Sequence, residues 1–242
     1  MATADLSVTG KQIVEAAMRE LGALASGEPA TPEELQDGLQ ALNLLVKSWM
    51  GPNNLLAPGL KIWQRTRTTL TLLEQNSFSV KLVTGDLLID PPISILSATL
   101  RNTDGEDLLI LTPMSLAEYQ AIPNKSVTGT PSRFYYERGI TEGTIYLDCI
   151  PSDTTMTIPL VYLRILNDFD ELDGSDPPDF PQEWFRPLKF NLAVDLYPEY
   201  PTCTGDRFKI IAALAQSTLA QANMFAPDNG DPVVYFEPGR DD

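Results

Sequence analysis

The chain has 242 residues, no histidine and a formal net charge of −16, from 17 basic and 33 acidic residues. The missing histidine excludes Ser-His-Asp and Cys-His catalysis and every histidine-ligated metal site. The acidic balance argues against ordinary DNA binding, which needs clustered Lys and Arg side chains to displace phosphate counterions.

The sequence also lacks the usual signals of membrane proteins, secreted proteins and common enzyme families. No stretch approaches the roughly 20 apolar residues of a membrane helix, and the N-terminus "MATADLSVTGK" lacks the basic and apolar regions of a signal peptide. Cys149 and Cys203 stand far apart and in no metal-ligand spacing. No phosphate-loop, dinucleotide-binding or serine-hydrolase motif is present. We therefore expect synthesis in the cytoplasm, no membrane partner, and no catalytic residue, metal or cofactor.

Residues 1–58 are predicted to form a pair of helices. Thr9 to Gln12 can form a capping box, and "TPEEL" at 31–35 is a second helix start with Pro32 at the first helical position. The two helices carry apolar stripes at spacings of three and four: Ile13, Val14, Ala17, Leu21 and Leu24, then Leu35, Leu39, Leu42, Leu45, Val46 and Trp49. Because the link between them is short, we expect an antiparallel helix hairpin.

Residues 59–166 change to a β pattern. Segments rich in β-branched and aromatic residues include "IWQRTRTTLTLL", "ISILSATLRN", "DLLILT", "RFYYER" and "MTIPLVYLRI". Turn signals such as "NTDGED" and "VTGTPS" separate them, and "SLAEYQAI" is the clearest short helix. We expect a compact, mostly antiparallel β domain inserted between helical segments.

Helical periodicity returns after an acidic, proline-containing linker at 167–181. In the predicted helix pair at 182–226, Trp184, Leu188, Leu192 and Leu196 repeat at four, and a second stripe runs from Phe208 to Phe225. Residues 227–242 contain three prolines and should be extended. The complete layout predicts an α+β protein: a four-helix bundle with an inserted, mostly antiparallel β domain and an extended C-terminal tail.

The acidic segment "NDFDELDGSDPPDFPQEWF" at 167–185 raises three interpretations. A calcium loop starting at Asp168 fails because Leu172 stands where an oxygen ligand is needed, and the glycine and final glutamate positions fail too. A pair of carboxylates for glycoside hydrolysis would require a particular separation in space. We favour a solvated linker whose charges repel one another and stabilise the helix start that follows.

Two further segments are candidate interaction sites. In a strand, Lys61, Trp63, Arg65 and Arg67 would share one face, which could contact DNA phosphate or an acidic partner, or could simply be a solvated strand face. The tail contains four consecutive apolar or aromatic residues, which either dock on another protein or fold back on their own domain. These tail residues are Val233, Val234, Tyr235 and Phe236.

Several segments together resemble the head-to-tail adaptor (connector) proteins of tailed bacteriophages, including the packaged-DNA-stabilisation and tail tubular proteins of short-tailed phages. The matching segments are "EYQAIP", "GTPSRFYY", "GTIYLDCIP", "LVYLRILNDF", "PDFPQEWFRPLKFNLAVDLYPEY" and the N-terminal "LNLLVKSWM". The resemblance covers most of the chain as many weak positions and not as one diagnostic motif.

The resemblance implies a structural virion protein that is not an enzyme. Such proteins form a ring, usually of twelve subunits, beneath the portal protein, connect the capsid to the tail or nozzle protein, help to retain the genome, and let double-stranded DNA pass without tight binding. The tail residues Val233 to Phe236 would then be portal contacts, and positions carried over to the bundle are Trp184, Leu188, Asn191, Leu192 and Tyr200.

Two alternatives stay open. The chain could be another neck or tail-completion (stopper) component, whose ring contacts the adaptor and not the portal. It could also be a carboxylate-dependent cell-wall hydrolase, in which Asp168 or Asp170 would be essential.

Overall fold

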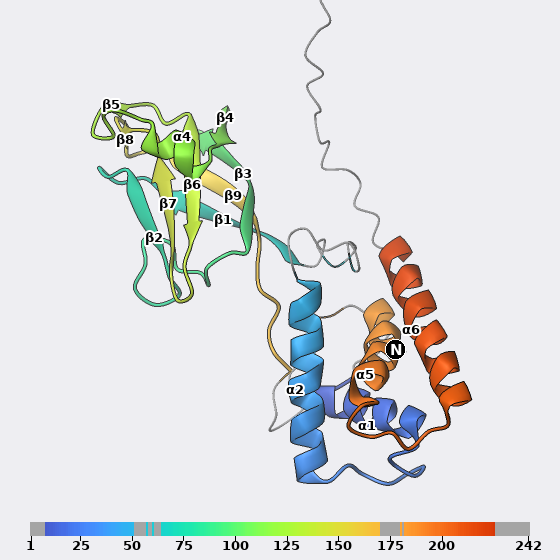
Figure 1. Cartoon of the computed structure of the whole chain (residues 1–242). Coiled ribbons are helices and arrows are strands. Elements are labelled where there is room, and N and C mark those ends of the chain that lie inside the picture. The colour runs from blue at the N-terminus through green and yellow to red at the C-terminus, as the bar shows by residue number, and fades with distance from the viewer. Residues whose placement is uncertain are drawn as a thin grey trace, which may run out of the picture. The chain divides into compact units, whose positions relative to one another are not determined.

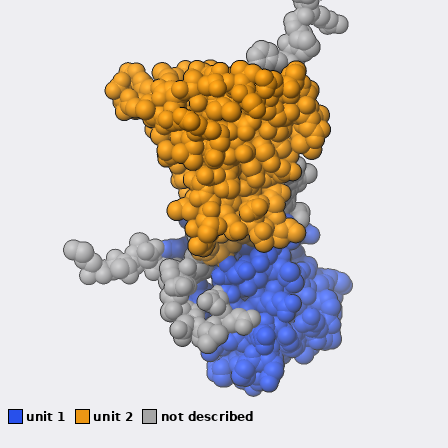
Figure 2. Space-filling view, turned by 90° about the vertical axis from the view of Figure 1, so that its left-hand side faces the viewer, with its two compact units in different colours: residues 1–49, 54–62, 168–242 blue, residues 50–53, 63–167 orange. Residues whose placement is uncertain are grey.

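The computed structural model describes residues 8–50, 57, 60, 64–169, 180 and 182–225. The chain divides into two compact units, shown in different colours in Figure 2. Residues 1–49, 54–62 and 168–242 make up the first, which we call the helical unit, and residues 50–53 and 63–167 make up the second, which we call the β unit. Within the described residues, no helix combines the length and the apolar character that a membrane span requires.

The helical unit begins with two helices whose starts follow the sequence signals. Before α1 (Gly10–Leu21), the Gln12 N–H donates to the Thr9 hydroxyl and the Thr9 N–H donates to the Gln12 side chain, so the predicted capping box is confirmed. The same reciprocal pair forms between Thr31 and Glu34 at the start of α2 (Pro32–Trp49). α1 ends at Gly22, whose φ of 78° is in the left-handed region that favours glycine.

The C-terminal half of the helical unit contains a short 3-10 helix (Gln182–Trp184), α5 (Phe185–Leu196) and α6 (Gly205–Phe225). The predicted repeat at four is confirmed, since all of its members are buried: Trp184, Leu188, Leu192 and Leu196. Trp184 lies against Trp49 of α2, with ring centroids 6.0 Å apart. Large apolar side chains from the N-terminal and the C-terminal helices therefore share one core.

The predicted four-helix bundle is wrong. α5 packs against α1, α2 and α6, but α1 lies across α2 and not alongside it (Figure 1). In a bundle the axes stay within about 20° of parallel. The crossing brings the backbone of Gly38 in α2 against Val14 in α1, so closely that a Cβ at Gly38 would lie 2.3 Å from Val14 Cγ1. Apolar periodicity predicted the buried faces correctly but could not predict the angle between them.

The β unit is built on a single curled sheet of seven strands (Figure 1), in the order β1-β9-β3-β4-β6-β7-β2. The strands of this sheet are β1 (Arg65–Thr71), β2 (Ser77–Val80), β3 (Ser94–Arg101), β4 (Asp107–Pro113), β6 (Arg133–Arg138), β7 (Gly143–Leu147) and β9 (Thr157–Leu163). Two short strands, β5 (Thr128–Gly129) and β8 (Ile150–Pro151), form a separate parallel pair.

The sheet is mixed, because one parallel pair of strands interrupts a set of antiparallel pairs. β4 and β6 pair in parallel through Thr112 and Pro113, and the other neighbouring strands of the sheet pair antiparallel. Parallel neighbours need a crossover connection, and α4 (Leu116–Gln120) lies in the segment that joins these two strands. The sequence predicted this short helix, but it did not reveal that the helix belongs to a crossover between two parallel strands.

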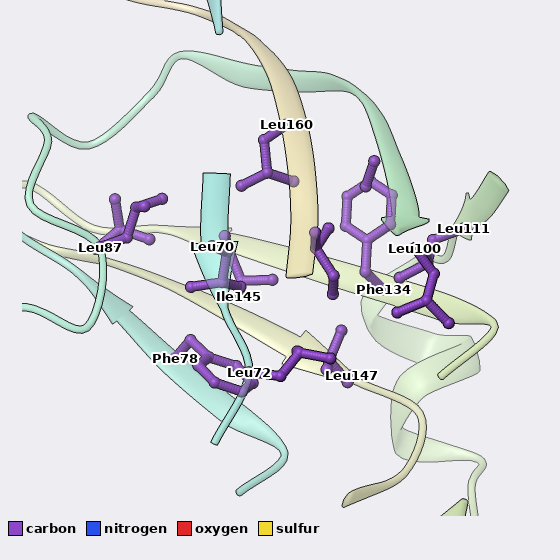
Figure 3. Close-up of a cluster of buried hydrophobic side chains, with 13 residues drawn as sticks. Leu70, Leu72, Phe78, Leu87, Leu100, Leu111, Phe134, Ile145, Leu147 and Leu160 are labelled. Atoms are coloured by element: carbon purple, nitrogen blue, oxygen red, sulfur yellow. The ribbon is translucent and has the colours of Figure 1, made fainter. Parts of the chain in front are cut away.

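The curl of the sheet encloses a hydrophobic core (Figure 3). Phe78, Phe134 and Ile145 are among its nearly fully buried members, and they come from β2, β6 and β7. β1, β3, β4 and β9 contribute Leu70, Leu100, Leu111, Ile158 and Leu160. The inward side chains alternate with outward polar residues, as expected for a sheet with one face in water.

Candidate interaction surfaces

The predicted site residues are only partly described. Arg65 and Arg67 lie on the exposed face of β1, two residues apart as the strand pattern predicted. Lys61 and Trp63 lie outside the described residues. The same is true of the tail residues Val233, Val234, Tyr235 and Phe236 and of residues 170–179 of the acidic segment.

Arg67 borders a shallow hollow of about 360 Å³ on the outer face of the sheet. Its walls come from β1, β3 and β9, which include Thr69, Ser97, Thr99 and Arg101. The register explains the grouping, because Val161 of β9 pairs with Arg67 on one side and with Ser97 on the other. The surface offers hydroxyl groups, the guanidinium groups of Arg67 and Arg101, and the Asp107 carboxylate from β4.

One of the two arginines at this hollow is already engaged. Arg101 Nε donates to Asp107 Oδ1 at 2.7 Å, and this hydrogen bond lowers the pKa of the Asp107 carboxyl below its ordinary value. Sequence reasoning missed Arg101. Alternation in "SATLR" does place Ser97, Thr99 and Arg101 on one face, but nothing in the sequence pairs that face with Arg67 across β9.

A second surface is the outer face of α6, which the sequence reading also missed. The buried stripe of this helix is Ile211, Ala215, Thr218 and Ala222. Its exposed side carries no charge after Lys209 and consists of Ile210, Ala213, Gln216, Ser217, Ala220, Gln221 and Met224. Ile210 and Met224 are 61% and 77% exposed, which is high for large apolar side chains.

The exposed charges of α6 are confined to its start, at Asp206, Arg207 and Lys209, whereas those of α2 and α5 extend to both ends of the helix. Exposed ionisable residues lie on α1 (Lys11), on α2 (Glu33 and Asp37) and on α5 (Arg186 and Asp195). In a chain with a net charge of −16, a long exposed helical face without charge is therefore distinctive. Such a face can meet another protein without the cost of desolvating or opposing charged groups.

Two described groups with possible chemistry, the Asp168 carboxylate and the Cys149 thiol, have structural explanations. Asp168, the first residue of the rejected calcium loop, lies 2.8 Å from Lys47 Nζ in an ion pair. Burial, together with the neighbouring Asp148 carboxylate, raises the pKa of the Cys149 thiol to about 11, so this group is not a thiolate at neutral pH. No group of three or more Cys, Asp or Glu residues in the described ranges could hold a metal ion.

A model of the SU10 adaptor protein family matches residues 8–231, which includes both units. The chain belongs to the SU10 adaptor protein family. No curated protein matches it. The resemblance to phage head-to-tail adaptors is thereby confirmed.

Membership in the adaptor family indicates the general function of the chain. The family consists of phage adaptors, which are structural components of the virion and not a class of enzyme. Adaptors work through contacts with portal and tail components. The surfaces that matter are therefore those that can bind protein, and the outer face of α6 and the exposed parts of the sheet are the described candidates.

Proposed function

We propose that copies of this adaptor assemble into a closed ring, of twelve subunits as the resemblance implies, at the neck of the virion. The ring binds the portal, connects the capsid to the tail, helps to retain the packaged genome and leaves a channel through which DNA exits. Assembly takes place in the host cytoplasm. Family membership across residues 8–231 supports the adaptor role, and the uncharged outer face of α6 supports the assembly.

The outer face of α6 is the observation that carries the proposal. Two copies that each bear a net charge of −16 repel one another, and this repulsion is smallest where the facing surfaces carry no charge. From Ile210 to Met224 every exposed residue of α6 is neutral. This uncharged part of the helix has 15 residues and is about 22 Å long at 1.5 Å per residue, which is long enough for a continuous contact with a neighbouring subunit.

The acidic composition suits a channel for DNA. A lumen with many carboxylates repels phosphate, so DNA passes without being held by the counterion release that drives DNA binding. The basic residues Lys61, Arg65 and Arg67, with Trp63 between them, form the contact with a neighbouring subunit or with DNA. Because they are few, any such contact with DNA is weak.

The tail completes the proposal as the portal contact. Val233, Val234, Tyr235 and Phe236 are apolar or aromatic and stand among prolines, glycines and acids. Aromatic residues anchor protein interfaces well because they bury a large area with few rotatable bonds. A segment that becomes ordered when it binds would couple docking of the adaptor to completion of the neck.

Charge insertion tests the assembly. The variant with Ala213→Glu and Ala220→Glu places two carboxylates on the outer face of α6 and should abolish ring formation in mass photometry while leaving the far-UV circular dichroism unchanged. The matched control, Gln36→Glu with Gln40→Glu, adds the same charge to exposed positions of α2, whose surface is already acidic. Equal ring formation by both variants would remove α6 from the interface.

Truncation tests the portal contact. A chain that lacks residues 227–242 should fold and assemble as the full chain does but bind purified portal protein much more weakly. Replacing Tyr235 and Phe236 by Ser in the full chain is the finer version of the same test. Unchanged portal binding by the truncated chain would contradict the assignment of the tail.

A further inference from the structure

The edges of the seven-stranded sheet are not equally protected. An unpaired strand edge presents rows of N–H and C=O groups that can pair with another chain, so proteins usually cover or charge it. The edge at β2 is covered by the chain that follows it. The Ser79 N–H donates to Asp86 Oδ2 at 2.7 Å, the Lys81 N–H donates to the Leu87 carbonyl at 3.1 Å, and the Leu87 N–H donates to the Ser79 carbonyl at 3.0 Å.

β4 has a second edge, which lies open. Residues Asp107–Leu111 pair with β3 on one side, whereas pairing with β6 on the other side begins only at Thr112. The Thr112 and Met114 N–H groups point toward β6, since they donate to Ser132 and Phe134. Backbone groups alternate in direction along a strand, so the N–H and C=O of Ile110 point to that same side, where no described strand pairs with them.

The side chains at this open edge are apolar and exposed. Leu108 is 52% and Ile110 is 73% exposed, and no charge interrupts the segment from Leu108 to Thr112. Exposed apolar residues along an unpaired edge are the features that natural proteins avoid unless the edge has a partner. The edge of β4 thus differs from that of β2, which is covered.

β1 provides a second open edge, at the end of the sheet that β9 and β3 separate from β4. It pairs with β9 only, so its other side has no strand neighbour among the described residues. Successive antiparallel pairing from β1 through β9 and β3 to β4 makes β1 and β4 run in opposite directions. An antiparallel pair between β4 of one copy and β1 of another would therefore continue the sheet with its normal geometry.

We infer that β4 of one copy pairs with β1 of the next copy, so that the sheets of neighbouring subunits join edge to edge. This inference rests on the proposed ring. The contact uses two different surfaces of the chain, and such head-to-tail interfaces generate rings when the rotation between copies closes. Strand addition of this kind derives its affinity from main-chain hydrogen bonds and its specificity from side chains that alternate along the strand.

Charge and symmetry favour this pairing over pairing of identical edges. Two β1 strands side by side would bring the arginines of both copies, including Arg67, onto one face, where like charges are destabilising. Two β4 strands side by side would form a closed dimer that cannot extend into a ring. When the strand that carries Arg67 pairs with the uncharged edge from Leu108 to Thr112, no like charges meet and the assembly can still extend into a ring.

Engineered disulfides test the pairing. In a full-length chain with Cys149→Ser and Cys203→Ser, the pair Ile110→Cys and Thr69→Cys places thiols on the outward face of each strand. Oxidation should give a ladder of covalent oligomers up to the size of the ring. The control pair, Ile110→Cys with Thr68→Cys, places the second thiol on the opposite face of β1 and should not form the ladder.

A proline at the edge provides the second measurement. Ile110→Pro removes the N–H that faces the open side and should raise the concentration needed for assembly at least about tenfold, while Ile140→Pro at a fully exposed turn should leave it unchanged. Three results would each overturn the pairing without refuting the proposed ring. These are unaltered assembly by Ile110→Pro, no ladder from assembled rings of the Ile110→Cys and Thr69→Cys variant, and covalent dimers from Ile110→Cys alone. A wild-type chain that forms no ring would instead refute the proposed function.

Discussion

Asp86 accepts two hydrogen bonds from Ser79, one from its backbone N–H at 2.7 Å and one from its hydroxyl at 2.8 Å. Together with the bonds between Leu87 and β2, they close one edge of the sheet. Partial burial is the largest single effect and by itself would raise the pKa of the Asp86 carboxyl, but the hydrogen bonds from Ser79, the Gln75 side chain and the Asp86 backbone together lower it below the ordinary value of 3.8. The charged form of Asp86 therefore stabilises the β unit.

Replacing this carboxylate should weaken the β unit in a pH-dependent way. Because the folded-state pKa is depressed, the stabilisation is present above the ordinary value of 3.8 and is lost as the pH falls through the lower folded value. Asp86→Ala should cost about 1 kcal/mol of unfolding free energy at pH 7, a value reduced for solvent screening, and less in acid. Urea unfolding of the variant and of the wild-type chain at pH 7 and near pH 3 measures the loss of unfolding free energy at each pH.

The control is Asp104→Ala, which removes an exposed carboxylate from the turn between β3 and β4. It changes the net charge equally and should change the stability by no more than about 0.5 kcal/mol. If Asp86→Ala and wild type differed by the same amount at both pH values, the cost would come from packing and not from the carboxylate.

Gly38 should not tolerate alanine, although alanine is the better helix former. Helix propensity favours Gly38→Ala by about 1 kcal/mol, but the added methyl would lie 2.3 Å from Val14 Cγ1. Overpacking of a buried contact costs about 1–3 kcal/mol, so the net effect should be destabilising. Thermal and chemical unfolding of the variant would measure it.

Gly205→Ala is the matched control for Gly38, because a Cβ at Gly205 would meet nothing within 4 Å. It should be neutral or slightly stabilising. In a Val14→Ala background, Gly38→Ala should cost less than it does in the wild-type chain, since the methyl then has room. A Gly38→Ala variant that is as stable as wild type would show that the contact between α1 and α2 yields easily.

Local structure was predictable here because its causes lie within a few residues of one another. The capping box at Thr9, the helix start at Pro32, the repeat at four from Trp184 and the short helix after Ser115 all formed as predicted. The strand at "RFYYER" formed over its full predicted length, Arg133–Arg138. Capping depends on side chains three residues apart, and alternation depends only on the strand itself.

The arrangement in space was not predictable, because it depends on contacts between distant residues. The crossing of α1 over α2 depends on the fit between Val14 and Gly38, which an apolar stripe does not encode. Likewise, β4 exchanges its partner at Thr112, so the mixed sheet and the open edge at Ile110 follow from pairing and not from composition. The uncharged face of α6, by contrast, is visible in the sequence as a charge-free run after Lys209.

Affinity for DNA should be low. The net charge of −16 repels the phosphate backbone, and the described hollow at Arg67 offers few cations. We expect a Kd for a 20-base-pair duplex weaker than about 10⁻⁴ M near 0.15 M salt, at or beyond the weak end of ordinary non-specific binding. Fluorescence anisotropy would measure it. A sub-micromolar Kd with a steep salt dependence would show that the chain holds DNA and does not merely let it pass.

The mass of the assembled species tests the central claim most directly. Native mass spectrometry of the full chain, alone and with purified portal protein, counts copies of a 26.7 kDa subunit. The ring proposal predicts one discrete closed oligomer, of twelve copies if the resemblance holds, that forms alone or on the portal and binds the portal as a unit. A chain that stays monomeric and does not bind the portal under either condition would contradict the proposal.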